Sequence, residues 1–264
     1  MNQQPQIVFD DGAAYDDFMG VWSRSVGETF LAWTRPAKGL DWIDVGCGNG
    51  AFTELIVRSA APKSILGVDP SEGQLSFARE HHTAGIARFE KAGAESLPAA
   101  DHSFDAAVMA LVIFFVPNPA KGVAEMRRVV KPGGQISAYA WDILGGGFPL
   151  DVIGEELIAL GIPAPLPPSV EVARLDALKK LWSDGGLTDV ETTAITVERT
   201  FPDFEALWRI NLKGPRLAQT TKSAAPDVLT KVKANVKAKL SPDASGRITC
   251  QARANAVKGW APAH

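Results

Sequence analysis

Short apolar runs alternate with amphipathic stretches through the first half of the chain. Apolar runs at residues 41–45, 64–68, 86–90, 104–109 and 135–141 predict strands, and the stretches at 51–60, 71–82 and 119–130 predict helices between them. Strands that alternate with helices form a parallel sheet through right-handed crossovers. The strand segments are apolar runs rather than alternating patterns, as expected when both faces of a sheet are covered. The pattern therefore predicts a doubly wound, Rossmann-like α/β fold.

The flanking segments complete this expectation. Apolar side chains repeat every three or four residues between 14 and 34, which predicts a helix ahead of the first strand. Beyond Gly145-Gly146-Gly147 the pattern changes, and a proline-rich connector follows at 163–168. Further helices are predicted at 149–160, 174–184, 203–212 and 226–240, and further strands at 189–197 and 247–258. We expect a seven-stranded, mostly parallel sheet whose last strand is antiparallel.

A chain of 264 residues accommodates these elements in one domain. We expect residues 1–40 to form an N-terminal helical cap and residues 41–142 to form the ligand-binding core. Residues 143–172 and 201–245 are expected to be helical inserts that form a lid and contact the substrate.

Composition restricts the cellular compartment and the class of partner. No signal peptide is visible at the start, and no apolar stretch is long enough to span a bilayer, which predicts a cytoplasmic protein without membrane insertion. Cys47 and Cys250 are the two cysteines, and the first lies in a glycine loop, so the sequence fits a reducing compartment better than a structural disulfide. The net charge of −3 argues against a nucleic-acid partner.

Charge is nevertheless uneven along the chain. From Phe201 to His264 there are 11 Lys/Arg and 4 Asp/Glu. Such a basic end could attract an anionic substrate. The alternative is a solvated helix face, because the lysines between 231 and 239 fall off the apolar stripe of that predicted helix.

The most informative segment is the loop after the first predicted strand. Gly46, Gly48 and Gly50 follow the strand at every second position, and a helix follows them, which allows the backbone to approach a ligand closely. Asp69 ends the next strand and could accept bonds from both hydroxyls of a ribose, or serve as a helix N-cap. Asp44 could anchor the loop or face the amino-acid end of a ligand. The loop also satisfies the dinucleotide fingerprint if Ala51 takes the third position.

Four segments in order resemble the motifs of class I S-adenosylmethionine-dependent methyltransferases. Asp44-Val45-Gly46-Cys47-Gly48-Asn49-Gly50 resembles motif I, and Gly67-Val68-Asp69-Pro70-Ser71 resembles the second motif. Phe104-Asp105-Ala106-Ala107-Val108 is similar to the fourth-strand motif, and Val129-Val130-Lys131-Pro132-Gly133-Gly134 resembles the turn before strand five. The lead-in from Tyr15 to Ser23 resembles the N-terminal helix of small-molecule enzymes of the ubiquinone-biosynthesis type.

This resemblance implies a set of cofactor contacts. The stretch after strand three would embrace the adenine, and relatives often have an acid where Gly93 stands, so the Ala94 backbone, Glu95 or packing must replace it. Leu111 would line the methionine side. The implied cofactor-binding residues are Tyr15, Phe18, Asp44, Gly46, Cys47, Gly48, Gly50, Asp69, Pro70, Gly93, Ala94, Glu95 and Leu111.

The sequence identifies the residues that would bind the methyl acceptor less clearly than those that would bind the cofactor. Methyl transfer is an in-line displacement that depends mainly on orientation and water exclusion, and aromatic faces tolerate a sulfonium. Tyr15, Phe18, Trp22 and Trp141 are therefore candidates for the site wall, and Phe114 suggests an apolar pocket; core packing is the alternative for these residues. Asp142 could orient an acceptor or take a proton, or could be a surface or capping acid. The candidates for catalysis are Tyr15, Trp141 and Asp142, and no general base is evident.

The leading hypothesis is methyl transfer from S-adenosyl-L-methionine to a small, partly apolar molecule, with S-adenosyl-L-homocysteine as product. Cysteines and histidines lack ligand spacing, so no metal is expected. A monomer or homodimer is expected. The alternatives are a non-catalytic S-adenosylmethionine-binding protein and a nicotinamide-dependent oxidoreductase, which does not account for the Lys131-Pro132-Gly133-Gly134 segment.

Overall fold

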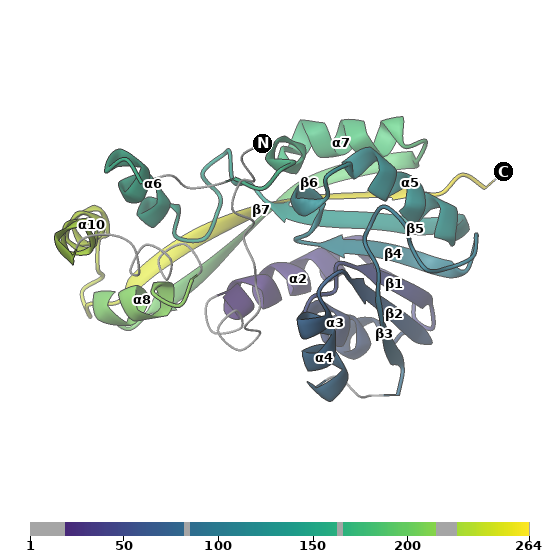
Figure 1. The fold of residues 1–264 in the computed structure, drawn as a ribbon, viewed down its shortest axis with the longest axis horizontal. Helices are drawn as coiled ribbons and strands as arrows, with labels where there is room; N and C mark the ends of the chain where they lie inside the picture. The colour runs from purple at the N-terminus through teal and green to yellow at the C-terminus, as the bar shows by residue number, and fades with distance from the viewer. Residues whose placement is uncertain (1–18, 82–84, 163–165, 215–225, 264) are drawn as a thin grey trace.

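A computed structural model describes residues 19–81, 85–162, 166–214 and 226–263. Seven strands form one sheet in the order β3-β2-β1-β4-β5-β7-β6. The five strands from β3 to β5 are parallel, and β7 pairs antiparallel with both β5 and β6 (Figure 1). The strands are β1 (Asp41–Val45), β2 (Ser64–Asp69), β3 (Ala87–Lys91), β4 (Phe104–Ala110), β5 (Val130–Trp141), β6 (Thr188–Phe201) and β7 (Ile248–Trp260). The predicted fold class is confirmed.

Helices cover both faces of the sheet, which explains its apolar strands. Figure 1 shows α2, α3 and α4 on one side and α5 and α7 on the other. The helices and 3₁₀ turns are α2 (Val21–Thr34), α3 (Ala51–Ala60), α4 (Glu72–His81), η2 (Ile113–Phe115), α5 (Pro119–Val129), α6 (Asp151–Ala159), η3 (Val170–Ala173), α7 (Leu175–Asp184), α8 (Phe204–Asn211) and α10 (Pro226–Lys239).

Helix α2 runs antiparallel to β5. The carbonyl of Thr34, at its end, accepts a hydrogen bond from the side chain of Gln135 near the start of β5 (3.3 Å). The ring of Phe30 lies 4.6 Å from that of Tyr139, further along β5. Gly27 faces Phe52 at the beginning of α3, where β1 has already ended. The first turn of α2 therefore reaches the carboxyl edge of the parallel strands.

One predicted turn is part of a strand. β5 begins at Val130, so Lys131, Gly133 and Gly134 lie within it and not before it. Gly133 has a φ of 76°, and the pairing of β4 with β5 shifts register at this point. The segment is thus an irregular strand start, which a side chain at Gly134 would disturb by meeting the Asp105 carbonyl at 2.6 Å.

β6 and β7 form a long two-stranded arm that extends beyond β5. Their pairing continues from Thr188 opposite Trp260 to Phe201 opposite Ile248, so β6 is longer than the predicted 189–197. Burial alternates along the outer part of β6, because this part of the arm is covered on one face only. Figure 1 shows α6, α8 and α10 at the far end of the arm.

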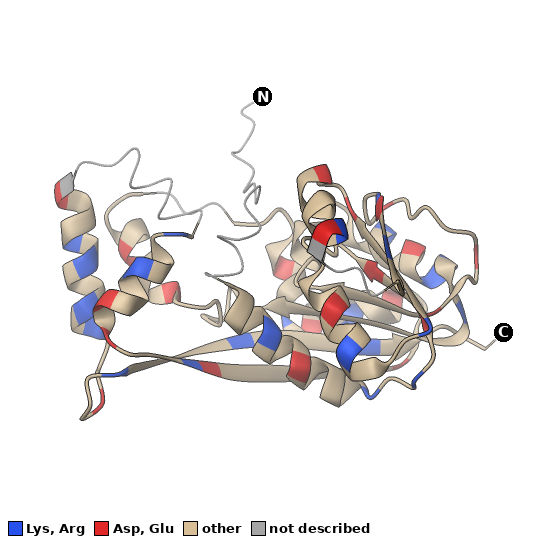
Figure 2. Ribbon diagram, turned by 90° about the horizontal axis from the view of Figure 1, so that it is seen from below, with Lys and Arg blue, Asp and Glu red and all other residues tan. Residues whose placement is uncertain are grey.

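The basic end of the chain is largely a solvated helix face. Val232 and Val236 of α10 are buried, whereas Lys237 and Lys239 are exposed. Lys233 pairs with Glu205 at 2.7 Å, and Lys239 pairs with Glu156 at 2.7 Å. Figure 2 shows these cations spread around α10 and not gathered on one broad surface.

Candidate functional site

The glycine loop is fixed to the neighbouring strand through its backbone. The N–H groups of Gly46 and Cys47 both donate to the carbonyl of Val68, at 2.7 and 3.0 Å. Gly46, Gly48 and Gly50 have φ values of 79°, 53° and 83°, which lie in the left-handed region. The loop therefore depends on glycine for its conformation, and its position follows from the pairing of β1 with β2.

Two of these glycines have opposite surroundings. A Cβ on Gly46 would collide with the side chain of Val112, which follows β4. A Cβ on Gly48 would have nothing within 4 Å. Gly46 is thus required by packing inside the protein, whereas Gly48 leaves open space at the carboxyl edge, where ligands of doubly wound sheets bind.

Asp44 is a fully buried carboxylate with one unused oxygen. Its Oδ2 accepts a hydrogen bond from the hydroxyl of Thr53 at 2.6 Å. Its Oδ1 has no partner among the described residues. Burial raises the pKa of Asp44 to about 7, with a further contribution from the negative charge of Asp69, while the Thr53 bond acts in the opposite direction. A buried acceptor without a partner is costly, so it indicates a group that the free chain lacks.

Asp69 fastens the loop to the next helix. Its Oδ2 accepts the N–H of Gly48 at 3.0 Å, and its Oδ1 accepts the N–H of Ser71 at 2.8 Å. The N-cap of α4 is Ser71, whose hydroxyl accepts the N–H of Gln74 at 3.4 Å, so Asp69 supports the cap residue and is not itself the N-cap. Burial raises the pKa of Asp69, and its bonds from Ser71 and Gly48 oppose the increase. Each carboxylate oxygen accepts more than one hydrogen bond, so capacity for two hydroxyls remains.

Cys47 contributes backbone rather than a reactive thiol. Its side chain packs with Leu75, Ala78 and Phe89, away from the open space at Gly48. Burial raises the pKa of the thiol, and the charges of Asp44 and Asp69 add to this effect. A thiolate nucleophile is thus disfavoured here.

The segment expected to hold adenine is only partly free to do so. Gly93 faces open space, and Pro70 is exposed. Glu95, however, accepts the N–H of Asn118 at 2.9 Å, just before α5 begins. One of its oxygens is thus committed to holding the α5 N-terminus, which leaves the Ala94 backbone and packing as the freer means of contact.

Leu111 and Phe114 follow β4 in a strained turn. Leu111 has a φ of 62°, an uncommon value for a residue with a side chain, and its N–H donates to Tyr139 at 2.8 Å. This strain lies at the edge where the cofactor is expected. Phe114 is buried in the main core, and its carbonyl accepts the N–H of Ser169, so core packing explains it as well as a pocket does.

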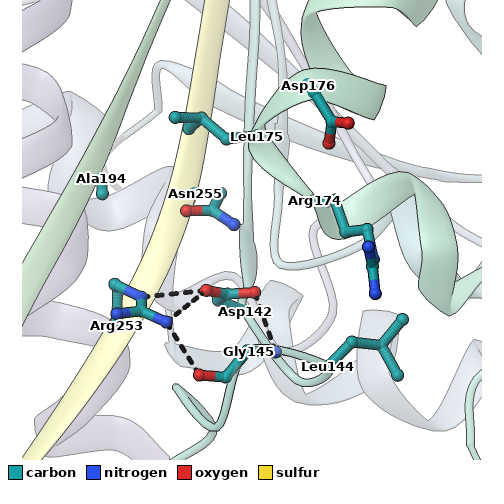
Figure 3. A pocket seen from close by; sticks show the side chains of 9 residues that line it. All are labelled: Asp142, Leu144, Gly145, Arg174, Leu175, Asp176, Ala194, Arg253 and Asn255. Atoms are coloured by element: carbon teal, nitrogen blue, oxygen red, sulfur yellow. Dashed lines mark hydrogen bonds and ion pairs between the residues drawn. The ribbon is translucent and has the colours of Figure 1, made fainter.

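Both oxygens of Asp142 are engaged by contacts within the protein. Arg253 of β7 donates to its Oδ2 from Nε at 2.9 Å and lies at 2.7 Å from it through Nη2 (Figure 3). Gly145 donates its N–H to Oδ1 at 3.2 Å, and the Gly145 carbonyl accepts Nη2 of Arg253. These contacts tie the start of the first insert to the arm. They argue against Asp142 as a general base, and Trp141 before it is buried in the core.

The remaining predicted site residues are only partly covered by the described structure. Tyr15 and Phe18 lie outside the described residues. Trp22 is buried in the first turn of α2, and its Nε1 has no partner among the described residues. His102 bonds the carbonyl of Val130 at the amino end of β5, far from the candidate site. In the part of the chain that the structure describes, no group of three or more His, Cys, Asp or Glu side chains could hold a metal ion.

Three contributors were missed from sequence. Thr53 binds Asp44 from one turn inside α3, Val112 fills the space at Gly46, and Arg253 neutralises Asp142. Thr53 could have been found, because a hydroxyl near the start of the helix after a glycine loop faces the end of the preceding strand. Val112 and Arg253 carry no local signal, since both act across the sheet.

Comparison with known families matches residues 43–138 to the model described as a methyltransferase domain. The chain is 31% identical over 128 residues to malonyl-[acyl-carrier protein] O-methyltransferase of Hahella chejuensis, covering 48% of this chain and 46% of that enzyme. It is 29% identical over 159 residues to ubiquinone biosynthesis O-methyltransferase of Dinoroseobacter shibae, covering 60% and 63%. The matches thus span about half to two thirds of these relatives.

The fold is shared more widely than the sequence. Phosphoethanolamine N-methyltransferase 2 of Haemonchus contortus, solved with phosphomonomethylethanolamine and S-adenosylhomocysteine, aligns with a TM-score of 0.58 at 17% identity. The alignment covers 94% of this chain and 56% of that one. This likeness extends the shared architecture beyond residues 43–138. No described helix is long and apolar enough to cross a membrane.

Proposed function

Residues 43–138 match the model of a methyltransferase domain, and on this premise we propose that the chain transfers a methyl group from S-adenosyl-L-methionine to a small, partly apolar molecule. S-Adenosyl-L-homocysteine would be the product. One matched relative is named for malonyl-[acyl-carrier protein] and the other for ubiquinone biosynthesis, and the matches cover only part of their length.

The carrying observation is the unpartnered Oδ1 of Asp44, together with the open space at Gly48. Burial raises the pKa values of both Asp44 and Asp69, so both acids would gain from a nearby positive charge. S-Adenosyl-L-methionine carries an ammonium and a sulfonium. The residues present therefore fit the positive groups of this donor in charge, and Gly48 leaves space for its approach.

Each part of the site has a role in this proposal. The glycine loop would hold the amino-acid end of the donor, with Asp44 accepting its ammonium. Asp69 would accept the ribose hydroxyls while keeping its bond to Gly48, which fixes the loop. Leu111 would lie along the methionine side, and Gly93 and Ala94 would border the adenine. Tyr15 and Phe18 stay proposed contacts.

The donor supplies an activated methyl group on its sulfonium, so little acid–base chemistry is needed from the protein. The chain would orient the acceptor and exclude water. Trp22 and Trp141 are the proposed walls on the acceptor side, with Phe114 behind them. Residues 143–172 and 201–245 would form the lid. We further propose a cytoplasmic protein that is a monomer or homodimer and needs no metal.

Calorimetry with S-adenosyl-L-methionine and S-adenosyl-L-homocysteine tests this proposal directly. We expect micromolar binding of both and marked weakening in Asp44→Asn, which removes the negative charge but keeps an acceptor for Thr53. Absence of binding at high ligand concentration would overturn it.

Two alternatives predict different results. A non-catalytic binding protein would bind both compounds but would transfer no labelled methyl group to any member of a broad acceptor panel. A nicotinamide-dependent oxidoreductase would instead bind reduced nicotinamide cofactors, which a change in their fluorescence would report.

A further inference from the structure

A cavity lies at the junction of the core with the arm. Its volume is about 420 Å³, within the range typical of small-molecule pockets. The lining comes from the end of β5, the start of α7 and the middle of the arm (Figure 3). The lining residues are Asp142, Leu144, Gly145, Arg174, Leu175, Asp176, Ala194, Arg253 and Asn255.

This cavity is close enough to the glycine loop to serve the same reaction. β1, β4 and β5 are neighbours in the sheet, and adjacent strands lie about 4.8 Å apart. Asp142, directly after β5, is therefore roughly 10 Å across the sheet from the loop that follows β1. A ligand in the cavity would lie on the acceptor side of the donor.

Most charge in the cavity wall is already neutralised. Asp142 and Arg253 bind each other, and Gly145 completes their interactions. Arg174 and Asp176, on either side of Leu175, are the two charged side chains that remain. Among the described residues Arg174 pairs with Glu171 alone, at 3.2 Å, and both side chains of that pair are more than half exposed, so the pair is weak.

Asp176 and Asn255 supply acceptors. Asp176 uses one oxygen for the N–H of Ala177, within its own helix. Asn255 is buried, and its Nδ2 donates to the carbonyl of Ala173 at 2.9 Å, whereas its Oδ1 accepts no hydrogen bond from any described residue. Figure 3 shows this amide among the residues around the cavity. Arg174 and Asp176 thus lie together on the α7 side of the cavity, whereas the Asn255 oxygen points toward Ala194 (Figure 3).

A plain anion does not match this wall, because Asp176 would repel it. A plain amine does not match it either, because Arg174 would repel that. A zwitterion with adjacent carboxylate and ammonium satisfies both, and Leu144 and Leu175 offer an apolar surface for its side chain. We infer that the cavity is a subsite for an amino-acid group of the methyl acceptor, with the carboxylate at Arg174 and the ammonium at Asp176.

This inference rests on the proposed function for its link to methyl transfer, but the binding is testable alone. The probes are L-leucine, leucinamide, which lacks the carboxylate, and 4-methylpentanoate, which lacks the ammonium. Calorimetry should show L-leucine binding at least about tenfold more tightly than either analogue. 2-Hydroxy-4-methylpentanoate should be weaker as well, because a hydroxyl is uncharged.

Variants connect the binding to this cavity. Arg174→Gln should weaken L-leucine about fivefold while leaving the weaker leucinamide unchanged, and Asp176→Asn should have the converse selectivity. Arg58→Gln is the matched control, since Arg58 forms a similarly exposed pair with Glu54 on α3. It should alter none of these affinities.

The outcomes separate this inference from the proposed function. Equal binding of 4-methylpentanoate and L-leucine, no leucine binding at millimolar concentration, or an unchanged affinity in Arg174→Gln would each overturn the subsite. So would leucine binding with no labelled methyl transfer to any amino-acid-bearing acceptor by a donor-binding protein. Donor affinity is measured in parallel on the same variants. If the wild type did not bind the donor, the proposed function would be overturned, whereas the result for leucine binding would stand by itself.

Discussion

Asp44 and Asp142 occupy similar places but have opposite surroundings. Both are buried acids at the carboxyl edge of the sheet, Asp44 in β1 and Asp142 directly after β5. Asp142 is held by Arg253 and Gly145, whereas Asp44 has a single bond from Thr53 and an oxygen without a partner among the described residues. Asp142 is thus used to hold the fold together, whereas Asp44 is available to a ligand.

This difference shows why residue type and edge position do not suffice to assign a role. Sequence made both acids candidates for the site, and Asp142 the one with possible proton chemistry. The hydrogen bonds of the two acids favour Asp44 as the ligand contact, because Asp142 is already neutralised by an arginine and bonded at both oxygens. The four predictions below test whether donor binding and structural support separate in this way.

The largest effect is expected from Gly48→Ala. Gly48 and Gly39 both have positive φ values, and a Cβ added to either would have nothing within 4 Å, but Gly39 lies in the turn before β1. Both alanine variants should lose about 1 kcal/mol of stability from backbone strain. Only Gly48→Ala should lower donor affinity in calorimetry, by about 100-fold, because its methyl group enters the ligand space. Equal donor affinities in the two variants would contradict this.

The next effect concerns stability. Asp142→Ala removes the partner of Arg253, whose side chain is 43% exposed, so we expect a loss of about 2 kcal/mol and not the larger loss typical of fully buried pairs. Asp101→Ala is the control, because Asp101 is exposed in its pair with Arg128 and should cost less than about 0.5 kcal/mol. Urea unfolding gives both values. Donor affinity should stay within about twofold of the wild type in Asp142→Ala; a large loss would return Asp142 to the site.

The third effect is a pH dependence of stability. The pKa of Asp44 is about 7 in the folded chain and near 4 when unfolded, so between these values the folded state holds a proton that the unfolded state has lost. Raising the pH through this window therefore lowers the free energy of unfolding. Relative to Asp44→Asn, the wild type should lose about 2 kcal/mol between pH 5 and pH 7. Parallel curves for the two proteins would show that Asp44 is ionised throughout.

The smallest effect is expected from Asp69→Asn. The amide keeps one acceptor oxygen and loses the other, so either the loop bond to Gly48 or a ribose contact is weakened. Donor affinity should fall about fivefold. Asp105→Asn is matched, since Asp105 also accepts a backbone N–H, that of Asp41, but at the amino edge of the sheet. It should leave donor affinity unchanged.

Local pattern was sufficient for most of the architecture. The order of strands and helices, the glycine loop and the acid that ends β2 could be predicted because each depends on neighbours within one or two turns of chain. The exceptions were the irregular start of β5 and the length of β6. Both depend on pairing with distant strands, which decides where an extended segment stops.

The sequence alone indicated which residues are candidates for chemistry, because a glycine loop and acidic strand ends are local features of the chain. The tertiary structure decided which of these side chains keep a free hydrogen-bonding atom for a ligand. Insertion of β7 between β5 and β6 brings Arg253 to Asp142 across 111 positions of sequence, and it leaves Asp44 without an equivalent cation among the described residues. A carboxylate bonds to the donors that lie nearest to it in space, and the order and register of the strands decide which donors these are.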